Sequence, residues 1–327
     1  MSIIGQYENL SDALLQGDLV VKVPVRMQWL RLFSIVGIPS AKYITAQAVN
    51  QGDSALPLEN AAFVTSGGTG GTDLSLTTIP QATFDLGMVS TGFEMTYAVE
   101  DVIDSPEEPT KLEEKIARVR IFQQLSQVVG KTSATGGEPP TLNELCADSR
   151  RVDVDATTQL DLELEMLDDA IGRISANEGI CTFAMMTTET LNTLYRAYYE
   201  RQLTPKPMPV HFPGIGNVPV PSHNGVPILI NDEIQSYTTA EVHTSSRVYF
   251  CTTRTNAINP DECLTMFTKQ KFLPNLVRTR RTNAIAAGST TFRIEVNMPI
   301  GVALPCDGAL SILEGFKLYT PPWAPVP

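Results

Sequence analysis

A glycine-rich stretch, TSGGTGGTD at residues 65–73, is the first part of this chain that could carry chemistry. Glycines let backbone amides approach an anion closely, so such a stretch can bind phosphate. A phosphate loop also requires a GK[ST] ending and a helix directly after it. Here that ending is missing and strand-like sequence follows. We therefore expect the tip of a hairpin and no phosphate site.

Acidic side chains between residues 161 and 169 are a second candidate: Asp161, Glu163, Glu165, Asp168 and Asp169. Paired carboxylates can bind metal or transfer protons, but acids on the polar face of an amphipathic helix usually form a solvated surface. No histidine or second carboxylate motif accompanies them. The sequence therefore favours a surface over a catalytic site.

The thiols and imidazoles are scattered along the chain. The cysteines are odd in number and never form a CxxC pair: Cys146, Cys181, Cys251, Cys263 and Cys306. The histidines lie in loop-like sequence: His211, His223 and His243. This pattern favours reduced, buried thiols over disulfides or zinc. We expect no catalytic residues, no cofactor and no metal site, and hence a protein that is not an enzyme.

The composition limits the class of partner. The 327 residues carry a formal net charge of −12, which argues against a surface built to bind nucleic acid tightly. We see neither a signal peptide nor an apolar run long enough to span a membrane, which predicts a cytosolic product without a membrane contact.

The elements that would position any site centre on one long helix, predicted over residues 110–129. Its apolar residues recur every three or four positions: Leu112, Ile116, Val119, Phe122, Leu125 and Val129. Upstream, the alternation over residues 19–27 predicts an extended strand, and Pro24 within it indicates a sheet edge or an arm.

Residues 42–49 and 82–99 read as two strands of a long hairpin, separated by Gly- and Ser-rich sequence. A two-stranded hairpin cannot cover its own faces. Its apolar side chains, Phe63, Phe84 and Met88 among them, must therefore be buried against something else, which we expect to be a second copy of the chain. No Lys or Arg lies between Lys42 and Lys111, so the basic Arg278, Arg280 and Arg281 are the candidate partners of this acidic segment.

The rest of the sequence predicts an α/β lobe. A helix over 157–177, a buried strand over 180–186 and a helix over 187–202 that Thr188 can cap follow each other. Further strands are expected at 226–230, 247–253 and 262–268, with the strand at 292–298 and the sequence ALSILEGF at 309–316 closing the sheet.

This order of parts resembles the tailed-phage major capsid protein of the Hong Kong 97 type. The sequences that carry the resemblance are KTSATGGEPPTLNEL at 131–145, HNGVPILINDEI at 223–234 and TTFRIEVNMPIGVALPCDGALSIL at 290–313, which looks like the family's closing strand pair. The resemblance implies an α+β fold with an N-terminal arm at 1–42 and an E-loop hairpin at 43–96. It also implies a P-domain at 97–145 and 271–327 that contains the long spine helix, and an A-domain at 146–270.

By this resemblance the protein would be a major capsid protein that self-assembles through pentamers and hexamers into an icosahedral shell around viral double-stranded DNA. Its location would be the virion, with assembly in the host cytoplasm. Scaffold, portal and decoration proteins would be further partners, and the DNA would be contacted weakly. Two alternatives stay open at this point: an encapsulin-type nanocompartment shell, which is similar in fold, and a soluble α/β enzyme.

Overall fold

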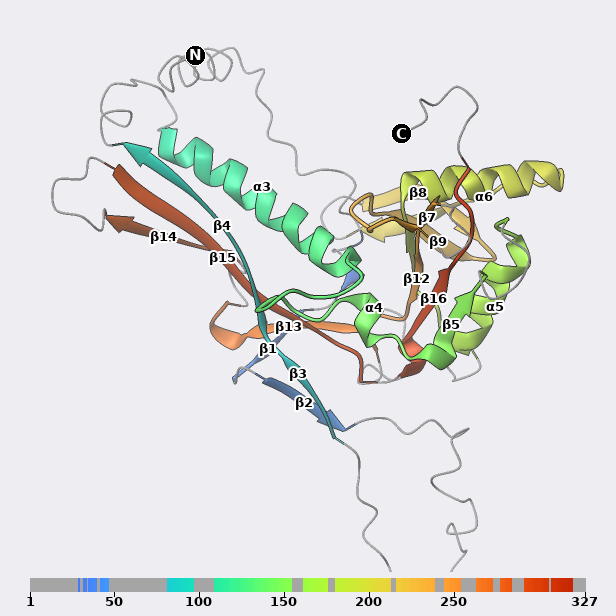
Figure 1. The fold of residues 1–327 in the computed structure, drawn as a ribbon, viewed down its shortest axis with the longest axis horizontal. Helices are drawn as coiled ribbons and strands as arrows, with labels where there is room; N and C mark the ends of the chain where they lie inside the picture. The colour runs from blue at the N-terminus through green and yellow to red at the C-terminus, as the bar shows by residue number, and fades with distance from the viewer. Residues whose placement is uncertain are drawn as a thin grey trace, which may run out of the picture.

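The computed structural model describes residues 29, 32–33, 35–39, 42–46, 81–96, 109–154, 161–175, 180–212, 216–238, 244–253, 263–272, 277–283, 291–305 and 307–319 (Figure 1). The predicted strand over 19–27 and the candidate contact residue Phe63 lie outside these ranges. None of the described helices combines the length and the hydropathy needed to cross a membrane.

The helices of the described residues are α3 (Pro109–Gly130), α4 (Leu142–Leu145), α5 (Leu164–Ser175) and α6 (Thr188–Glu200). Short 3₁₀ turns are η3 (Asp148–Arg150), η5 (Gln270–Phe272) and η6 (Asp307–Ala309). The long helix predicted over 110–129 is thus confirmed as α3.

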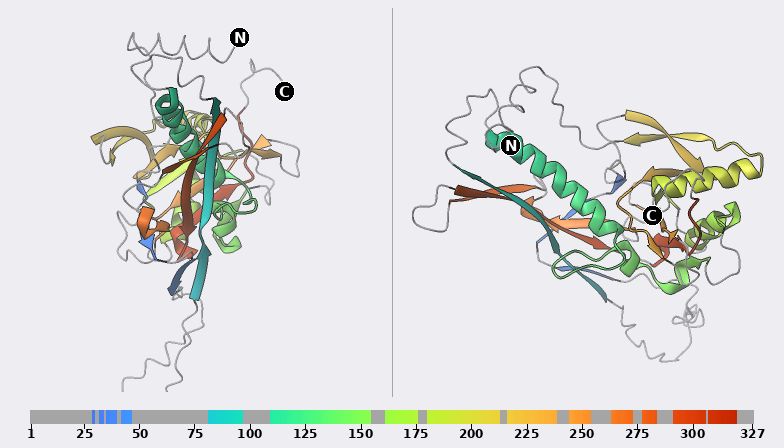
Figure 2. Two further views of the ribbon diagram at one scale, coloured as in Figure 1. Left: turned by 90° about the vertical axis from the view of Figure 1, so that its left-hand side faces the viewer. Right: turned by 45° about the horizontal axis from the view of Figure 1, so that its top comes forward.

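A five-stranded sheet packs against α3 through β4 and β15, and the right-hand view of Figure 2 shows the helix running over these strands. Its strands are β1 (Ile35–Ile38), β4 (Gly87–Thr96), β13 (Thr265–Lys269), β14 (Arg278–Asn283) and β15 (Thr291–Ala303). β15 pairs antiparallel with β4 along nearly its whole length, and with β14 and β13 on the other side. Alternate residues of β15 are buried: Phe292, Ile294, Val296 and Met298. This period-two face confirms the strand expected from the sequence.

The hairpin that the sequence predicts is present at its base. β2 (Lys42–Ala46) pairs antiparallel with β3 (Gln81–Asp85), from Lys42 opposite Asp85 to Ala46 opposite Gln81. The second strand of the hairpin continues past Leu86 into β4, which leaves β2 and joins β15. Residues 87–96 therefore belong to the sheet under α3.

A seven-stranded sheet forms the core of the α/β lobe, in the order β5-β16-β12-β6-β9-β8-β7. Its strands are β5 (Arg151–Asp153), β6 (Phe183–Met186), β7 (Pro207–Phe212), β8 (Gly216–His223), β9 (Val226–Ile230), β12 (Val248–Cys251) and β16 (Leu310–Glu314). A separate two-stranded pair is β10 (Tyr237–Thr238) with β11 (Thr244–Ser245). The helices α5 and α6 cover one face of the sheet (Figure 1).

Two hydrophobic clusters hold these parts together. One cluster lies on the side of both sheets that faces α3. It includes Ile121 and Leu125 of the helix, Val296 of the five-stranded sheet, and Phe183 and Tyr249 of the seven-stranded sheet. Trp29 and Phe33 are buried in it, with Phe33 edge-on to Phe183 at 5.7 Å between ring centroids. The other lies between the seven-stranded sheet and the helices α5 and α6. Because the first cluster crosses from one sheet to the other, the lobe and the α3 sheet share a core.

Several details differ from the sequence predictions. Within the described residues the helix predicted over 157–177 runs only from Leu164 to Ser175, and residues 161–163 are not helical. The buried line of α3 runs through Ala117, Ile121, Leu125 and Val128–Val129, while Ile116, Val119 and Phe122 are only half-buried. Thr187, and not Thr188, caps α6, because its side chain accepts the backbone N–H of Thr190 at 3.1 Å.

The strands of the expected closing pair lie in different sheets. β15 belongs to the five-stranded sheet, whereas β16 inserts between β5 and β12 of the seven-stranded sheet. The chain thus crosses from one sheet to the other within the loop before η6 (Asp307–Ala309). The prediction of paired strands here was wrong, because apolar alternation specifies a strand but not its neighbour.

Candidate functional site

The outer face of β14, β15 and β4, opposite α3, is charged and exposed. Arg280 lies across from Glu295, and Arg293 lies across from Glu94 on β4. Residues paired across strands point to the same face, so these charges alternate in sign over the sheet. Arg293 also forms an ion pair with Glu295, with 3.4 Å between Nε and Oε1. The outer face is therefore polar, and Arg280 lies on it at β14, which is a strand at the edge of the sheet.

The three predicted arginines do not form one cluster. Arg278 and Arg280 lie on the outer face, and the guanidinium of Arg278 donates to the carbonyl of Lys271 at 2.7 Å. Arg281 points to the α3 side, where its guanidinium lies 3.9 Å from the centroid of the buried Phe292 ring. On the same side, the hydroxyl of Thr279 donates to Glu114 of α3 at 2.6 Å. Only two of the three arginines therefore lie on the outer face of the sheet.

Basic residues continue from Arg278 around the end of the sheet. An open hollow of about 570 Å³ is lined by Ile38, Pro39, Lys269, Gln270 and Lys271. Lys269 ends β13 and Lys271 lies in η5, directly beside the Arg278 side chain. We call the four residues Lys269, Lys271, Arg278 and Arg280 the basic corner. The sequence analysis identified its arginines but missed its lysines, because they precede β14 by several residues and meet it only in the fold.

Of the predicted apolar contact residues, Phe84 and Met88 fall within the described chain and behave differently. Phe84 is half-buried and packs on the cluster of Ile38, Phe267 and Ala303 within the same subunit. Met88 is 50% exposed on the outer face of β4. Its backbone N–H donates to the carbonyl of Gly137 at 2.9 Å, in the loop after α3. Of Phe84 and Met88, Met88 is therefore the side chain that is exposed enough to contact another molecule.

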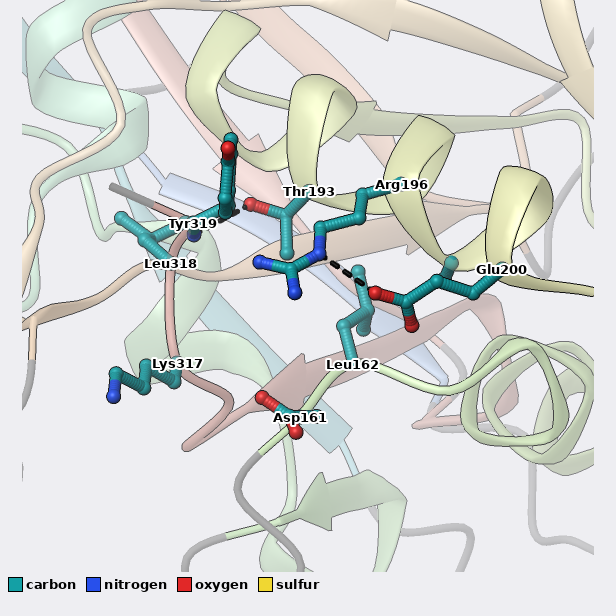
Figure 3. Close-up of a pocket in the computed structure, with 9 residues that line it drawn as sticks. Asp161, Leu162, Thr193, Arg196, Glu200, Lys317, Leu318 and Tyr319 are labelled. Atoms are coloured by element: carbon teal, nitrogen blue, oxygen red, sulfur yellow. Dashed lines mark hydrogen bonds and ion pairs between the residues drawn. The ribbon is translucent and has the colours of Figure 1, made fainter. Parts of the chain in front are cut away.

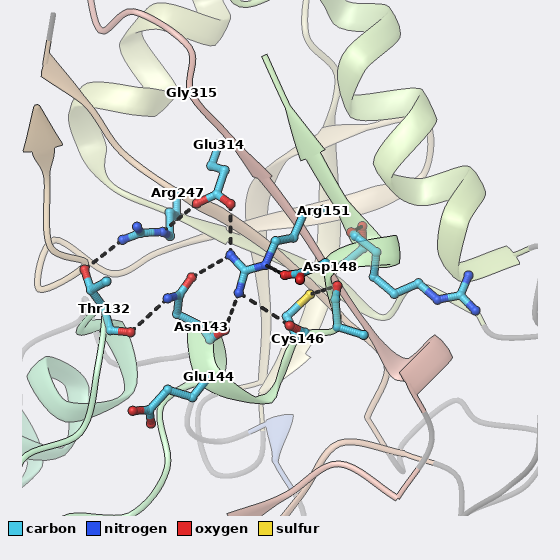
Figure 4. Close-up of polar contacts among 12 residues, drawn as sticks. Thr132, Asn143, Glu144, Cys146, Asp148, Arg151, Arg247, Glu314 and Gly315 are labelled. Atoms are coloured by element: carbon cyan, nitrogen blue, oxygen red, sulfur yellow. Dashed lines mark hydrogen bonds and ion pairs between the residues drawn. The ribbon is translucent and has the colours of Figure 1, made fainter. Parts of the chain in front are cut away.

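A buried ionic network joins the loop after α3 to the lobe (Figure 4). Glu314 of β16 accepts from Arg151 at 2.9 Å through Oε1 and from Arg247 at 2.8 Å through Oε2. Arg247 also donates to the hydroxyl of Thr132 at 3.0 Å, and its guanidinium lies over the Tyr237 ring at 4.3 Å. The Arg247 side chain is only 7% exposed and that of Glu314 14%. We call this network the Glu314 joint.

The Glu314 joint also binds α4. Arg151 donates to the side-chain oxygen of Asn143 at 2.8 Å, and Asn143 in turn donates to the carbonyl of Thr132 at 2.8 Å. Burial lowers the pKa of Arg151, but the hydrogen bond and charge of Glu314 outweigh it and raise that pKa. The network therefore connects the loop after α3, α4, β5 and β16 through hydrogen bonds and ion pairs.

A second polar cluster, which the sequence analysis missed, surrounds His223. Its Nε2 lies 2.8 Å from the carboxylate of Asp168, and its Nδ1 is hydrogen-bonded to the hydroxyl of Tyr198. The residues come from α5, α6 and the end of β8, and His223 is buried. The tight turn at Asn224 and Gly225, both with positive φ, places the imidazole between the helices. The hydrogen bonds of His223 thus connect the turn to α5 and α6.

A hollow of about 360 Å³ lies where the chain beyond β16 crosses α6 (Figure 3). The Arg196 guanidinium donates to Glu200 at 2.7 Å and lies 4.6 Å from the centroid of the Tyr319 ring. The Tyr319 N–H donates to the hydroxyl of Thr193 at 3.0 Å. The charged groups on its walls are of both signs, which fits attachment of the crossing segment to α6.

Among the described thiols, Cys146, Cys251 and Cys263 are buried and Cys181 is half-buried. Burial raises the pKa of Cys181 to about 12 and raises that of Cys251 well above the usual value. A thiol in this state stays protonated and is a poor nucleophile and metal ligand. Among the described residues, no group of three or more His, Cys, Asp or Glu side chains could hold a metal ion.

Comparison of the sequence with protein-family models and with curated proteins gives no match. Solved structures do match. The encapsulin of the holo-SrpI complex from Synechococcus elongatus PCC 7942 has a TM-score of 0.65 and 13% identity, over 96% of this chain and 98% of that chain. A chain of Mycobacterium phage Bobi has a TM-score of 0.55 and 10% identity, over 91% and 93%.

The capsid of a native GTA particle has a TM-score of 0.53 and 12% identity, over 91% of this chain and 92% of that chain. The chain has the Hong Kong 97-type capsid fold. Identities this low establish the fold alone. The likeness extends over nearly all of both chains in each comparison, so the Hong Kong 97-type fold accounts for the lobe and the α3 sheet together.

Proposed function

We propose that this protein is the major capsid protein of a tailed phage and that its copies assemble into a closed icosahedral shell around double-stranded DNA. The observation that carries the proposal is the full-length likeness to shell-forming chains, with more than 90% of this chain covered in the phage Bobi and GTA comparisons. A domain fused to an unrelated function would match over only part of either chain.

The proposed regions follow from the resemblance and from strand pairing. We keep an arm at 1–42, an E-loop hairpin beginning at residue 43, a P-domain around α3 as its spine helix, and an A-domain formed by the lobe. β4 is assigned with β15, its partner in the sheet, and β16 with β12 and β5. The A-domain thus contains a strand from the last part of the chain.

The contact between copies is proposed to join the basic corner of one copy to the acidic hairpin of the next. Between Lys42 and Lys111 the chain has no Lys or Arg, whereas acids are present throughout. The basic corner presents exposed Lys271, Arg278 and Arg280 on a chain of net charge −12. Opposite charges on the two segments favour their association and select the register of docking. Met88, exposed on the adjoining sheet face, provides an apolar group beside them.

Assembly is tested by sedimentation velocity and negative-stain imaging of the purified protein. We expect particles of uniform size, held by interfaces that bury more than about 2,000 Å² in total. A compact monomer that persists at every protein and salt concentration tried would refute a shell of any kind.

An encapsulin-type shell is the second candidate, since the encapsulin comparison has the higher TM-score of 0.65 against 0.55 and 0.53. Particle contents separate the two. A phage head should hold nuclease-protected DNA when formed in its host, and an encapsulin should hold a protein cargo. We do not propose an enzyme, because neither the Glu314 joint nor the His223 cluster opens onto a substrate-sized hollow among those described.

A further inference from the structure

The C-terminal end of α3 is held by the segment that follows β9, residues 231–235, which we call the helix socket. The backbone N–H of Gln235 donates to the carbonyl of Gly130 at 3.0 Å. The side-chain amide of Asn231 donates to the carbonyl of Ser126 at 3.5 Å. Carbonyls in the last turn of a helix lack partners within the helix, so the Gly130 carbonyl gains its partner from the lobe. The socket therefore fixes where α3 ends.

Gly130 lies against the helix socket so closely that no side chain fits. A Cβ atom at this position would be 2.8 Å from the carbonyl oxygen of Glu233 and 2.8 Å from the Cα of Ile234. Both are backbone atoms, which cannot rotate away as the end of a side chain can. Ile234 is 3% exposed and belongs to the core that α3 shares with the lobe. The absence of a Cβ at Gly130 therefore sets how near the helix and the lobe approach each other.

The position of α3 at the socket affects a larger part of the molecule. The helix has 22 residues, which at a rise of about 1.5 Å per residue gives a length of about 33 Å. The strands β4 and β15 pack along it, and Figure 1 shows the helix leading from these strands to the lobe. The five-stranded sheet must therefore follow any change in the direction of α3.

A small displacement at Gly130 is enlarged along this length. A Cβ 2.8 Å from the Cα of Ile234 is about 0.7 Å nearer than the shortest ordinary carbon–carbon contact of about 3.5 Å. A shift of about 0.7 Å across a helix contact about 9 Å wide turns the helix by about 4° and moves its far end by about 2.5 Å. The angle between the lobe and the five-stranded sheet thus depends on the contact at Gly130.

A closed shell is built from identical copies, so a change of angle within one copy is repeated in all of them. We propose that Gly130 in the helix socket sets the angle between the lobe and the five-stranded sheet, and through this angle the diameter of the shell. This inference rests on the proposed shell function. Gly130 is a positioning residue, because it is buried and acts through the direction of α3.

The first test is Gly130→Ala, which adds the one atom that the socket excludes. The matched control is Gly172→Ala in α5, where an added Cβ meets nothing within 4 Å. Both changes replace a helical glycine with a better helix former, so the control reproduces the effect on helix propensity. In negative-stain images, Gly172→Ala should keep the parent's single peak of particle diameter. Gly130→Ala should shift that peak or give open fragments.

A second variant loosens the socket without adding volume. The side chain of Gln127 donates to Glu233 at 3.0 Å, and that of Gln235 accepts from the N–H of Thr132 at 3.4 Å. Both contacts are exposed, so Gln127→Ala combined with Gln235→Ala should leave the melting temperature within a few degrees of the parent. The particles should nevertheless have a broader range of diameters. The control is Gln123→Ala, one turn earlier on α3.

Gly130→Ala particles with the parent's diameter would overturn the proposal, and so would a Gly172→Ala control that shifts the diameter as much. If circular dichroism shows that Gly130→Ala does not fold, the double variant decides, and the parent's distribution of diameters would then overturn the proposal. An unmodified chain that stays monomeric under all conditions removes the shell function itself. Uniform parent shells together with unshifted variants remove only the role of Gly130.

Discussion

Two groups of arginines in this molecule differ in what surrounds them. Arg151 and Arg247 lie in the Glu314 joint, where one carboxylate accepts from both and their side chains are 18% and 7% exposed. Arg278 and Arg280 lie on the outer face of β14, where they are exposed. Arg281 is also exposed, but it lies on the opposite face of β14, with its guanidinium over the ring of the buried Phe292.

The role of an arginine in this fold therefore depends on its burial and its partners, and not on residue type alone. A buried guanidinium must keep its partners, because an unpaired buried charge is costly, and it therefore fixes the elements that supply them. An exposed guanidinium contributes little to the free energy of folding and remains available to a second molecule.

The largest effect is expected from Glu314→Ala, which leaves two buried guanidiniums without their shared carboxylate. Removal of one partner from a buried ion pair typically costs about 3–5 kcal/mol in the free energy of unfolding. Urea unfolding of unassembled protein measures it. The control is Glu295→Ala, whose exposed pair with Arg293 should be worth about 0.2–1 kcal/mol. Equal losses of unfolding free energy in the two variants would contradict the proposed difference between buried and exposed ion pairs.

Arg281→Ala should have an intermediate effect. Its guanidinium lies 3.9 Å from the Phe292 centroid, a cation–π contact worth about 0.5–2 kcal/mol. Arg280→Ala, one residue earlier and on the opposite face, should change the unfolding free energy by less than about 0.5 kcal/mol. If Arg280→Ala destabilises the isolated subunit as much as Arg281→Ala, the assignment of the two faces is wrong.

Glu138→Gln tests a half-buried pair through its dependence on pH. Burial raises the pKa of Glu138, but hydrogen bonds from Lys131 and Thr135 outweigh it and lower that pKa. A carboxyl group with a lowered pKa in the folded state stabilises the fold above its unfolded pKa, and this contribution is lost as pH falls through the folded pKa. Parent and variant should therefore differ by about 1 kcal/mol at pH 7 and converge below about pH 4. A difference that is constant over this range would contradict the ion pair.

Arg280→Glu should have the smallest effect on folding and a measurable one on assembly. Each exposed pair is worth only about 0.2–1 kcal/mol, but a shell repeats it in every subunit. Light scattering should show slower or weaker assembly, most clearly at low salt, where screening is least. Arg120→Glu, at an exposed position of α3, is the matched control. Assembly that matches the parent from low to high ionic strength would place the contact elsewhere.

Local sequence patterns predicted the elements well where one face alone is apolar. The strand at 292–298 alternates strictly and is buried as expected, and α3 begins and ends within one residue of its prediction. The buried face of α3 was predicted less well. Apolar residues surround much of this helix, and the sheet and lobe packed on it select Ile121 and Val128 over Ile116 and Val119.

The candidate site was predictable only in part, for a similar reason. Arg278, Arg280 and Arg281 are adjacent in sequence, but the period of two in a strand sends Arg281 to the opposite face from its neighbours. The sequence analysis treated the three as one basic patch because it did not assign them a face. The hairpin of β7 and β8 was not predicted, because proline-rich sequence is typical of irregular structure, whereas an edge hairpin accepts proline at outward positions.

By itself the sequence determined the α+β class, the long helix, the base of the hairpin and the absence of charge between residues 207 and 231. These properties depend on neighbours within a few residues, where periodicity and composition act directly. The tertiary structure decided the partners over long separations: β4 with β15, β16 with β12 and β5, and Glu314 with Arg151 and Arg247. Glu314 and Arg151 are brought together across 163 positions because β16 inserts beside β5. No local pattern encodes such a pairing, since it depends on which surfaces the whole chain can bury at once.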